Sequence, residues 1–257
     1  MTYSERGESV KRIYTIKYAC SCTVGKVRKN NEDNFFCDGV IRINPDSNDD
    51  VSFKGEVKST DNALFSVFDG MGGEACGEVA SFIAANNCIG FYEDRQQYGE
   101  YLYELMYLLN ERILEETKAR SLVLMGSTAA MIQFYKDKIY IANAGDSRIY
   151  KLTKNKLKQI SLDHTADGYS KKAPLTKFLG TPDPNGLMPF IAFGAYKTAD
   201  VFILCTDGIY DMVSESEMTE ILTQKKELDV LAKELTDKAV EHGGVDNATV
   251  ILCKITK

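Results

Sequence analysis

The chain has 257 residues, of which 44% are hydrophobic and 26% charged, and its formal net charge is −6. This composition is typical of a globular protein with a sizeable core, and the acidic balance argues against a nucleic-acid partner. No run approaches the roughly 18 apolar residues of a membrane span. The polar stretch Met1–Gly7 lacks the apolar core of a signal peptide. We therefore expect a single cytoplasmic domain over residues 1–257 that binds neither nucleic acid nor membrane.

The cysteine pattern favours a reducing compartment. The seven cysteines are Cys20, Cys22, Cys37, Cys76, Cys88, Cys205 and Cys253. Their number is odd, and most lie in apolar or helix-like segments. Only the first two form a C-x-C pair, and a zinc site would need a second Cys/His cluster. We expect reduced, buried thiols.

The first third of the chain predicts strands separated by polar turns. Residues Arg12–Cys22 alternate like a first strand, and a short strand is predicted at Asn34–Cys37. The following polar stretch, Asp38–Asn62, predicts an exposed hairpin or excursion of modest order. Its two weak strands are expected around Val40–Ile43 and Val51–Val57. Because the stretch is long, it could be a docking surface or tolerated loop growth, and we favour loop growth.

The turn Val24–Asn34 carries three charged residues of interest: Arg28, Glu32 and Asp33. Its Gly and Asn content is typical of a loop. As a surface loop it would be unremarkable. As a site loop it supplies an anion-binding arginine together with carboxylates for a metal.

An apolar strand at Leu64–Phe68 stops at Asp69, which is followed by Gly70 and by two further glycines, Gly72 and Gly73. Burying a carboxylate at the end of an apolar strand is costly unless its charge is compensated. A glycine-rich turn lets a backbone carbonyl approach a ligand closely. The pattern therefore suggests that Asp69 and the Gly70 carbonyl face a cation. The alternative is a tight turn in which Asp69 caps the next helix.

The middle of the chain predicts two amphipathic helices, Glu74–Tyr92 and Tyr98–Arg120, from their helical apolar period. Four short β-rich segments with turns between them predict an antiparallel meander. These segments are Ser127–Tyr135, Lys138–Gly145, Ser147–Thr153 and Lys156–Ser161. Asp146 lies in the turn between the second and the third.

The last third begins with a loop, Asp163–Phe193, which holds four of the five prolines and one expected helical turn at Leu175–Gly180. A buried strand, Ala199–Cys205, then ends at Asp207-Gly208, as the earlier strand ends at Asp69-Gly70. The remaining predicted elements are the helices Ser214–Leu222 and Leu228–His242 and the strand Ala248–Ile255, which Asp246-Asn247 precedes. Strands and helices in blocks favour an α+β fold with antiparallel sheets.

Three aspartates, Asp69, Asp207 and Asp246, thus lie where turns meet apolar strands. Asp146 and the Glu32-Asp33 pair have similar positions. If they gather at one edge of a sheet pair, their mutual repulsion needs a cation. Oxygen ligands without a His/Cys cluster favour Mg²⁺ or Mn²⁺ over zinc.

Eight blocks follow one another in a specific order. They are Gly25–Asp33 with Arg28, Val67–Gly73, Gly126–Ala129, Asn143–Arg148, Asp163-His164, Leu175–Gly180, Leu204–Gly208 and Asp246–Val250. Each block alone is weak, but the ordered set, over about Tyr14–Ile255, resembles the metal-dependent protein phosphatases of the protein phosphatase 2C type. A small catalytic domain of this kind looks like the bacterial members.

The resemblance implies a four-layer α-β-β-α sandwich of two antiparallel sheets flanked by helices, with two Mn²⁺ or Mg²⁺ ions and a possible third. By matching position, the resemblance implies that Asp69 bridges both ions. The Gly70 carbonyl and Glu32 or Asp33, directly or through water, would bind one ion, and Asp207 and Asp246 would bind the other. Asp146 would bind the third ion, and Arg28 would bind the substrate phosphate.

The chain departs from the family pattern in two places besides the long stretch at 38–62. Many members carry His after the Asp-Gly pair as a suggested general acid, but here the residue is Met71. His164 and His242 are no obvious replacements, and His164 is interpreted as a structural turn residue. The region after Asp163-His164 is shorter than the flap typical of bacterial members, which puts substrate preference and the third ion in question.

The expected activity is hydrolysis of phosphoserine and phosphothreonine on proteins by a water that bridges two divalent ions. Such esters are dianions near neutral pH, two metals can activate and orient water, and an arginine fork suits two phosphate oxygens. We expect phosphoprotein substrates of a Ser/Thr kinase, a role in signalling, and a monomer. One alternative is a catalytically impaired relative that binds and regulates partners, although Arg28, Asp69, Asp207 and Asp246 are all present. Another is a phosphatase for a small phospho-metabolite or for an anti-sigma-factor antagonist.

Overall fold

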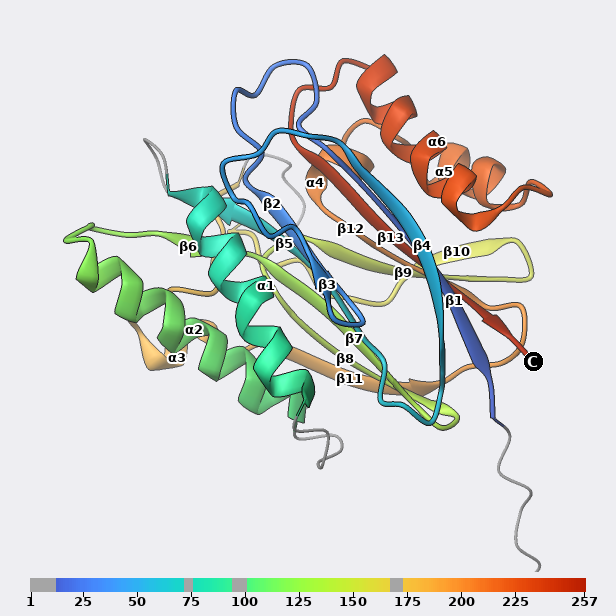
Figure 1. The fold of residues 1–257 in the computed structure, drawn as a ribbon, viewed down its shortest axis with the longest axis horizontal. Coiled ribbons are helices and arrows are strands. Elements are labelled where there is room, and N and C mark those ends of the chain that lie inside the picture. Colours follow the sequence, from blue (N-terminus) through green and yellow to red (C-terminus); the bar gives the residue numbers. More distant parts are fainter. Residues whose placement is uncertain (1–12, 72–75, 94–100, 167–172) are drawn as a thin grey trace, which may run out of the picture.

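The computed structural model describes residues 13–71, 76–93, 101–166 and 173–257. Two antiparallel sheets form its centre (Figure 1). The first sheet has, in spatial order, β10 (Lys156–Gln159), β9 (Arg148–Thr153), β12 (Val201–Cys205), β13 (Ala248–Thr256), β1 (Thr15–Thr23) and β4 (Val51–Lys58). The second has β11 (Phe190–Ala195), β8 (Lys138–Ala144), β7 (Ala129–Tyr135), β5 (Leu64–Met71), β2 (Asp33–Cys37) and β3 (Val40–Ile41), with β6 (Gly126–Ser127) paired to β5.

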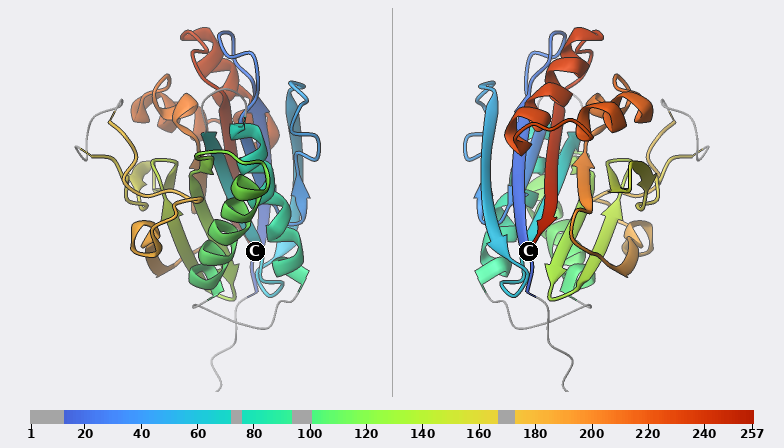
Figure 2. Two further views of the ribbon diagram at one scale, coloured as in Figure 1. Left: turned by 90° about the vertical axis from the view of Figure 1, so that its left-hand side faces the viewer. Right: turned by 90° about the vertical axis from the view of Figure 1, so that its right-hand side faces the viewer.

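Helices cover the outer face of each sheet (Figures 1 and 2). The helices are α1 (Gly77–Glu93), α2 (Tyr101–Ala119), α3 (Pro184–Leu187), α4 (Asp207–Tyr210), α5 (Glu215–Leu222) and α6 (Leu228–Glu241). Buried side chains of α1 and α2 pack on the second sheet, and those of α4, α5 and α6 pack on the first. The predicted four-layer α-β-β-α sandwich of class α+β is therefore confirmed.

A core rich in aromatic residues joins the two sheets. Phe134 on β7 is fully buried and packs edge-on against Phe65, Tyr196 and Phe202, with ring centroids 5.9, 5.5 and 5.3 Å away. Such edge-to-face pairs add to the free energy of burying each ring. This contact ties strands of both sheets together.

The burial pattern of each strand follows from its place in the sheet. β1 is buried on both faces except at Lys17, because one face meets the second sheet and the other meets α6. β4 alternates between partly buried and exposed residues, because it forms an edge of the sheet. β1 pairs along its whole length with β13, from Thr15 opposite Thr256 to Thr23 opposite Ala248. This pairing brings the loops near the two ends of the described chain together.

Of the two alternatives predicted at 38–62, the hairpin is wrong. Its two strands exist, but β3 pairs with β2 in the second sheet and β4 pairs with β1 in the first. The stretch therefore crosses from one sheet to the other. Arg42, only 5% exposed, orders it by donating hydrogen bonds to the backbone carbonyls of Asn31, Asp33 and Ser47.

The predicted four-stranded meander is also wrong. β7 pairs with β8, and β9 pairs with β10, but β8 and β9 lie in different sheets. The chain crosses between the sheets at Gly145, whose positive φ of 99° suits glycine.

The loop predicted at 163–193 holds more structure than expected. The described part contains α3 and the edge strand β11, which pairs with β8 from Phe190 opposite Asn143. The helical turn expected at Leu175–Gly180 is not formed. This segment instead makes two isolated bridges, Thr165 to Leu175 and Ser127 to Leu179.

Two compositional expectations can be checked directly. All seven cysteines are free, and all but Cys76 are buried, as predicted. None of the described helices combines the length and apolar character needed to cross a bilayer. The start expected for the first helix, at Glu74, falls outside the described residues.

We predict that Phe134→Ala lowers the free energy of unfolding by about 3–5 kcal/mol, because it leaves a cavity between the sheets. Urea unfolding followed by circular dichroism measures the change. Phe193→Ala is the matched control, because Phe193 is 81% exposed and its loss should change stability by less than about 0.5 kcal/mol. Equal effects of both substitutions would contradict the role of the inter-sheet ring cluster.

Candidate metal and phosphate site

Strand pairing places two of the predicted site carboxylates next to each other. Asp33 on β2 lies directly opposite Asp69 on β5. The Gly70 N–H donates to the Glu32 carbonyl, 3.0 Å away, which continues the pairing into the turn. Like charges directly opposite each other destabilise a sheet. The pairing therefore creates a local need for a cation or for protons.

Asp33 is 1% exposed and receives hydrogen bonds from two threonines. Thr206 Oγ1 and Thr249 Oγ1 donate to its Oδ2 at 2.7 and 2.6 Å. Burial raises the pKa of Asp33 to about 7, although both threonine hydrogen bonds act in the opposite direction. The pKa of its neighbour on the other strand, Asp69, is raised as well.

Asp69 is surrounded by other carboxylates. Burial raises its pKa well above the ordinary value, and Asp207, Asp33, Asp146 and Asp246 raise it further, in that order. Its backbone is fixed by Thr128, whose Oγ1 accepts from the Asp69 N–H at 3.0 Å and whose N–H donates to the Asp69 carbonyl at 2.8 Å. Asp69 belongs to β5 and not to the start of α1, so the alternative that it caps the next helix is wrong.

Asp207 and Asp246 approach the cluster from the first sheet. Asp207 lies two residues after the end of β12 and opens α4, while Asp246 lies just before β13. Burial, then Asp246 and then Asp146, raise the pKa of Asp207 to about 8. Burial also raises the pKa of Asp146, at the crossing between β8 and β9.

Steric crowding explains why glycine follows Asp69 and Asp207. A Cβ on Gly70 would lie 1.9 Å from the Gly77 carbonyl oxygen, and one on Gly208 would lie 1.9 Å from the Asn247 carbonyl oxygen. No side chain fits at either position. The Asp-Gly pattern therefore reflects close backbone packing around the carboxylates.

Asn247 holds the loop that carries Arg28. Its Nδ2 donates to the carbonyls of Val24 and Asn30 at 3.0 Å each, and its Oδ1 accepts from the Glu32 N–H at 2.8 Å. Arg28 Nη2 then lies 2.7 Å from Asp246 Oδ2, and its Nη1 lies 3.7 Å from Glu32 Oε2. With 48% of its side chain exposed, Arg28 remains accessible to a ligand.

The oxygen donors suit a hard divalent cation, because every predicted side-chain ligand is a carboxylate and several are buried beside one another. In their present conformations, no three His, Cys, Asp or Glu side chains within the described ranges are grouped closely enough to hold a metal ion. Arg28 donates a hydrogen bond to one carboxylate oxygen of Asp246. The predicted ligand set would therefore require Arg28 to release Asp246 and the carboxylates to turn toward a common point.

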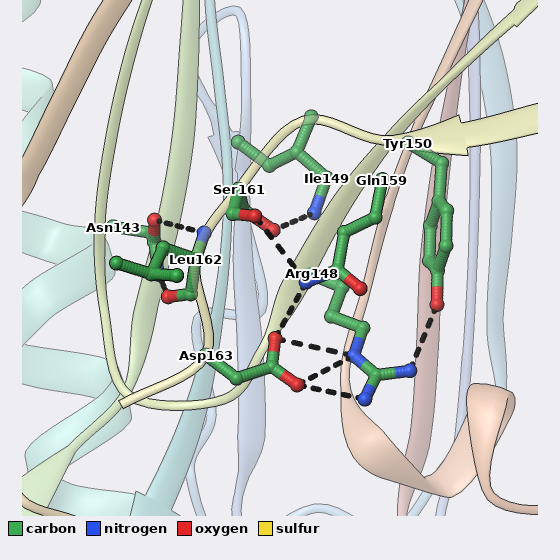
Figure 3. A network of polar contacts seen from close by, with 8 residues as sticks. All are labelled: Asn143, Arg148, Ile149, Tyr150, Gln159, Ser161, Leu162 and Asp163. Atoms are coloured by element: carbon green, nitrogen blue, oxygen red, sulfur yellow. Dashed lines mark hydrogen bonds and ion pairs between the residues drawn. The ribbon is translucent and has the colours of Figure 1, made fainter. Parts of the chain in front are cut away.

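Arg148 holds the segment after β10 in place through Asp163 (Figure 3). Arg148 Nη2 and Nε donate to Asp163 Oδ2 at 2.7 and 3.0 Å, and its Nη1 donates to the Tyr150 hydroxyl at 3.0 Å. The guanidinium also stacks 3.7 Å above the Tyr210 ring. Arg148 is therefore a structural clamp rather than a free anion-binding group.

Several residues of the site were missed by the sequence reasoning. Thr128, Thr206 and Asn247 lie within the eight ordered blocks, so their positions could have marked them. Arg42 gave no signal, because it lies in a polar stretch that resembles a surface loop. Its guanidinium fixes the backbone at Asp33. Gly72 and Gly73, expected to complete the glycine-rich turn, fall outside the described residues.

A two-sheet sandwich with clustered carboxylates and an exposed arginine at one end is the architecture of a metal-dependent phosphatase, and comparisons with known proteins agree. A family model described as protein phosphatase 2C matches residues 42–240. The serine/threonine phosphatase stp of Listeria welshimeri is 30% identical over 250 residues, which cover 89% of this chain and 91% of that protein. The chain therefore belongs to the protein phosphatase 2C family.

Two further comparisons concern the phosphatase PstP. The serine/threonine protein phosphatase PstP of Mycobacterium tuberculosis is 27% identical over 261 residues, which cover 93% of this chain and 45% of that protein. A crystal structure of the PstP catalytic domain in complex with two manganese ions has a TM-score of 0.78 and 25% identity, and covers 96% of this chain and 100% of that one.

The raised pKa values predict an unusual pH dependence of stability without metal. In the unfolded chain these carboxyls titrate near pH 4, whereas folding raises the pKa of Asp33 to about 7 and that of Asp207 to about 8. Between these limits the folded state binds more protons than the unfolded state. Stability in EDTA should therefore fall as the pH rises from about 4 to about 8.

Added Mg²⁺ replaces those protons, so it should raise the melting temperature more at pH 8 than at pH 6. At a hundredfold excess over the dissociation constant, the gain at pH 8 should be on the order of 5–10 °C. Calorimetry in EDTA and in Mg²⁺ measures both effects. A gain independent of pH, or one that persists in Asp207→Asn, would contradict the carboxylate cluster as the site of binding.

Proposed function

We propose that this chain is a metal-dependent protein phosphatase that hydrolyses phosphoserine and phosphothreonine on proteins with two Mn²⁺ or Mg²⁺ ions. The observation that carries the proposal is the convergence of five aspartates from five separated segments beside the accessible Arg28. The family and its named serine/threonine phosphatases support it. The alternative of a catalytically impaired binding protein has no support in the sequence, because no predicted ligand is replaced in this chain.

The proposed ligands follow the positions of the side chains. Asp69, central in the cluster, would bridge both ions. The Gly70 carbonyl with Asp33 and Glu32, directly or through water, would hold one ion, and Asp207 with Asp246 would hold the other. Asp146 would serve a possible third ion. When bound, the ions would supply activation of water and neutralisation of charge on the phosphoryl oxygens.

The chain's own residues would do the remaining work. Arg28, once released from Asp246, can direct its planar fork at two phosphate oxygens. Asn247 holds the Arg28 loop in place, and Thr128 fixes the backbone of Asp69. Met71 carries no proton to donate, and buried His164 lines a separate pocket, so neither side chain serves as general acid.

We further propose that the chain acts as one domain and as a monomer on proteins phosphorylated by a Ser/Thr kinase, in signalling. A reducing, cytoplasmic location is supported by the seven free thiols, because disulfides are rare in reducing compartments.

The first test is release of phosphate from a phosphothreonine peptide and from para-nitrophenyl phosphate in Mn²⁺, in Mg²⁺ and in EDTA. We expect release only with metal. Asp69→Asn and Asp207→Asn should each reduce it to background, because each removes a charge that the ions need. Asp237→Asn is the control, since it changes a half-exposed carboxylate on α6. Activity retained in either cluster variant with an intact fold would refute the metal assignment.

Arg28→Ala should raise KM for the phosphopeptide by about 10-fold or more, because hydrogen bonds to charged groups are worth about 1.5–3 kcal/mol. Steady-state kinetics on folded variants measures the change. Arg112→Ala is a matched control, because Arg112 is equally exposed, at 48%, and pairs with Glu115 on α2. A KM that does not move in Arg28→Ala would remove this residue from phosphate binding.

A further inference from the structure

A cavity of about 360 Å³ lies beside the β8–β9 crossing and outside the carboxylate cluster. Its lining includes Tyr103, Tyr107, Leu162, His164, Lys177 and Ile191. We refer to it as the His164 pocket. The pocket is apolar at its rim and polar at one buried point, which is the usual build of a site that binds and orients a ligand.

The polar point is His164. It is 5% exposed, and neither of its ring nitrogens has a hydrogen-bond partner within the described residues. Burial is the main cause that lowers its pKa to about 4, so the ring is neutral and offers one donor and one acceptor. A buried polar group without a partner is costly, so a ligand that hydrogen-bonds to the ring would be favoured.

The rim presents apolar side chains that no other part of the described chain covers. Leu162, Met188 and Ile191 are 53%, 58% and 39% exposed. The rings of Tyr103 and Tyr107, on the first turns of α2, lie 4.7 Å apart at the same cavity. Contiguous exposed apolar groups of this kind mark binding surfaces. Lys177 adds a positive charge, which favours the face of an aromatic ring.

Several hydrogen bonds hold the wall that carries Leu162 and His164, and Figure 3 shows those at Leu162 and Asp163. The Asn143 side chain makes two hydrogen bonds to the Leu162 backbone. Its Nδ2 donates to the Leu162 carbonyl at 2.6 Å, and its Oδ1 accepts from the Leu162 N–H at 3.2 Å. Arg148 holds Asp163 with three hydrogen bonds. The His164 N–H donates to the Gly145 carbonyl at 3.0 Å. A preformed wall lowers the ordering cost of binding.

The same contacts place the pocket close to Asp146, at the edge of the proposed ion site. Gly145, which holds His164, directly precedes Asp146, and Phe190 in the opposite wall pairs with Asn143, three residues earlier. Three residues of chain span at most about 10 Å. An extended peptide rises about 3.3 Å per residue, so a residue a few positions from a bound phosphoresidue can reach the pocket.

We propose that the His164 pocket binds an aromatic side chain that carries a hydrogen-bonding group, tyrosine or tryptophan, from the phosphoprotein substrate a few residues from the phosphorylated one. The ring packs against the apolar rim, and its O–H or N–H pairs with the imidazole. The inference rests on the proposed phosphatase activity and adds a determinant of its substrate choice.

The test is a set of phosphothreonine peptides in an alanine background, with a single tyrosine moved from five positions before to five positions after the phosphothreonine. One position should raise kcat/KM by roughly 10-fold over the all-alanine peptide, as filling an apolar pocket does. Phenylalanine at that position should recover only part of the gain, because it lacks the hydroxyl. Tryptophan should recover most of it.

Two matched variants on β11 locate the effect. Ile191→Asp should bring the tyrosine-to-alanine ratio of kcat/KM close to one, because it places a charge in the rim. Phe193→Asp should leave that ratio unchanged, because Phe193 is exposed on the same strand but does not line the pocket. In His164→Leu, the tyrosine and phenylalanine peptides should become equal while both still exceed the alanine peptide. A purely structural role of His164 would lower all three rates together.

Hydrolysis of para-nitrophenyl phosphate separates the two proposals. If the wild-type protein hydrolyses it but the tyrosine scan is flat, the pocket proposal is overturned and the phosphatase proposal stands. If no phosphate is released from any substrate, the phosphatase proposal fails first. An equal loss of tyrosine preference in Ile191→Asp and Phe193→Asp would also overturn the pocket proposal. If His164→Leu does not fold, two comparisons still test the pocket proposal. They are the tyrosine and phenylalanine peptides with the wild-type protein, and the variants Ile191→Asp and Phe193→Asp.

Discussion

The repulsion among carboxylates at one end of the sandwich is the constraint on which the rest of the structure depends. The pairing of β2 with β5 sets Asp33 opposite Asp69, and Asp207, Asp246 and Asp146 raise the pKa of Asp69 further. Without a cation, the folded chain relieves this repulsion only by holding protons or by turning Arg28 onto Asp246. A fold that accepts such a cost at a single place gains a strong preference for divalent ions there, because ions replace both the protons and the arginine.

The long antiparallel pairing of β1 with β13 makes this arrangement possible. It brings the loop after β1 against the loop before β13, where Asn247 binds the backbone at Val24, Asn30 and Glu32. Arg28 and Asp246, more than two hundred residues apart in the chain, thus become neighbours. The position of Arg28 relative to the carboxylates is therefore a property of sheet topology. Small changes at Asn247 would act on substrate binding through this loop.

Amphipathic helices and apolar strands carry their own periodicity, so the residues predicted an α+β fold with antiparallel sheets, and the resemblance to the protein phosphatase 2C family implied the four layers. The sequence also marked the carboxylates, since an apolar strand that ends in Asp-Gly is unusual twice in one chain. It could not predict which strands pair. β8 and β9 follow each other closely but separate at Gly145, and β3 and β4 join different sheets, because pairing depends on the inter-sheet ring core and not on local pattern. The role of Arg42 could not be predicted for the same reason, because its hydrogen bonds go to carbonyls that only the folded backbone brings together.

The crossing at Gly145 links catalysis to recognition. On one side it carries Asp146 of the carboxylate cluster, and on the other it accepts the hydrogen bond of His164 in the pocket wall. Arg148, a few residues on, holds Asp163 between the two and stacks on Tyr210 of α4, the helix that Asp207 opens. An aromatic side chain seated against His164 therefore presses on the segment that positions Asp146 and, through Arg148, on the one that positions Asp207. A substrate that fills the pocket would order the acidic site as well as anchor itself, so its benefit should extend to kcat and not to KM alone.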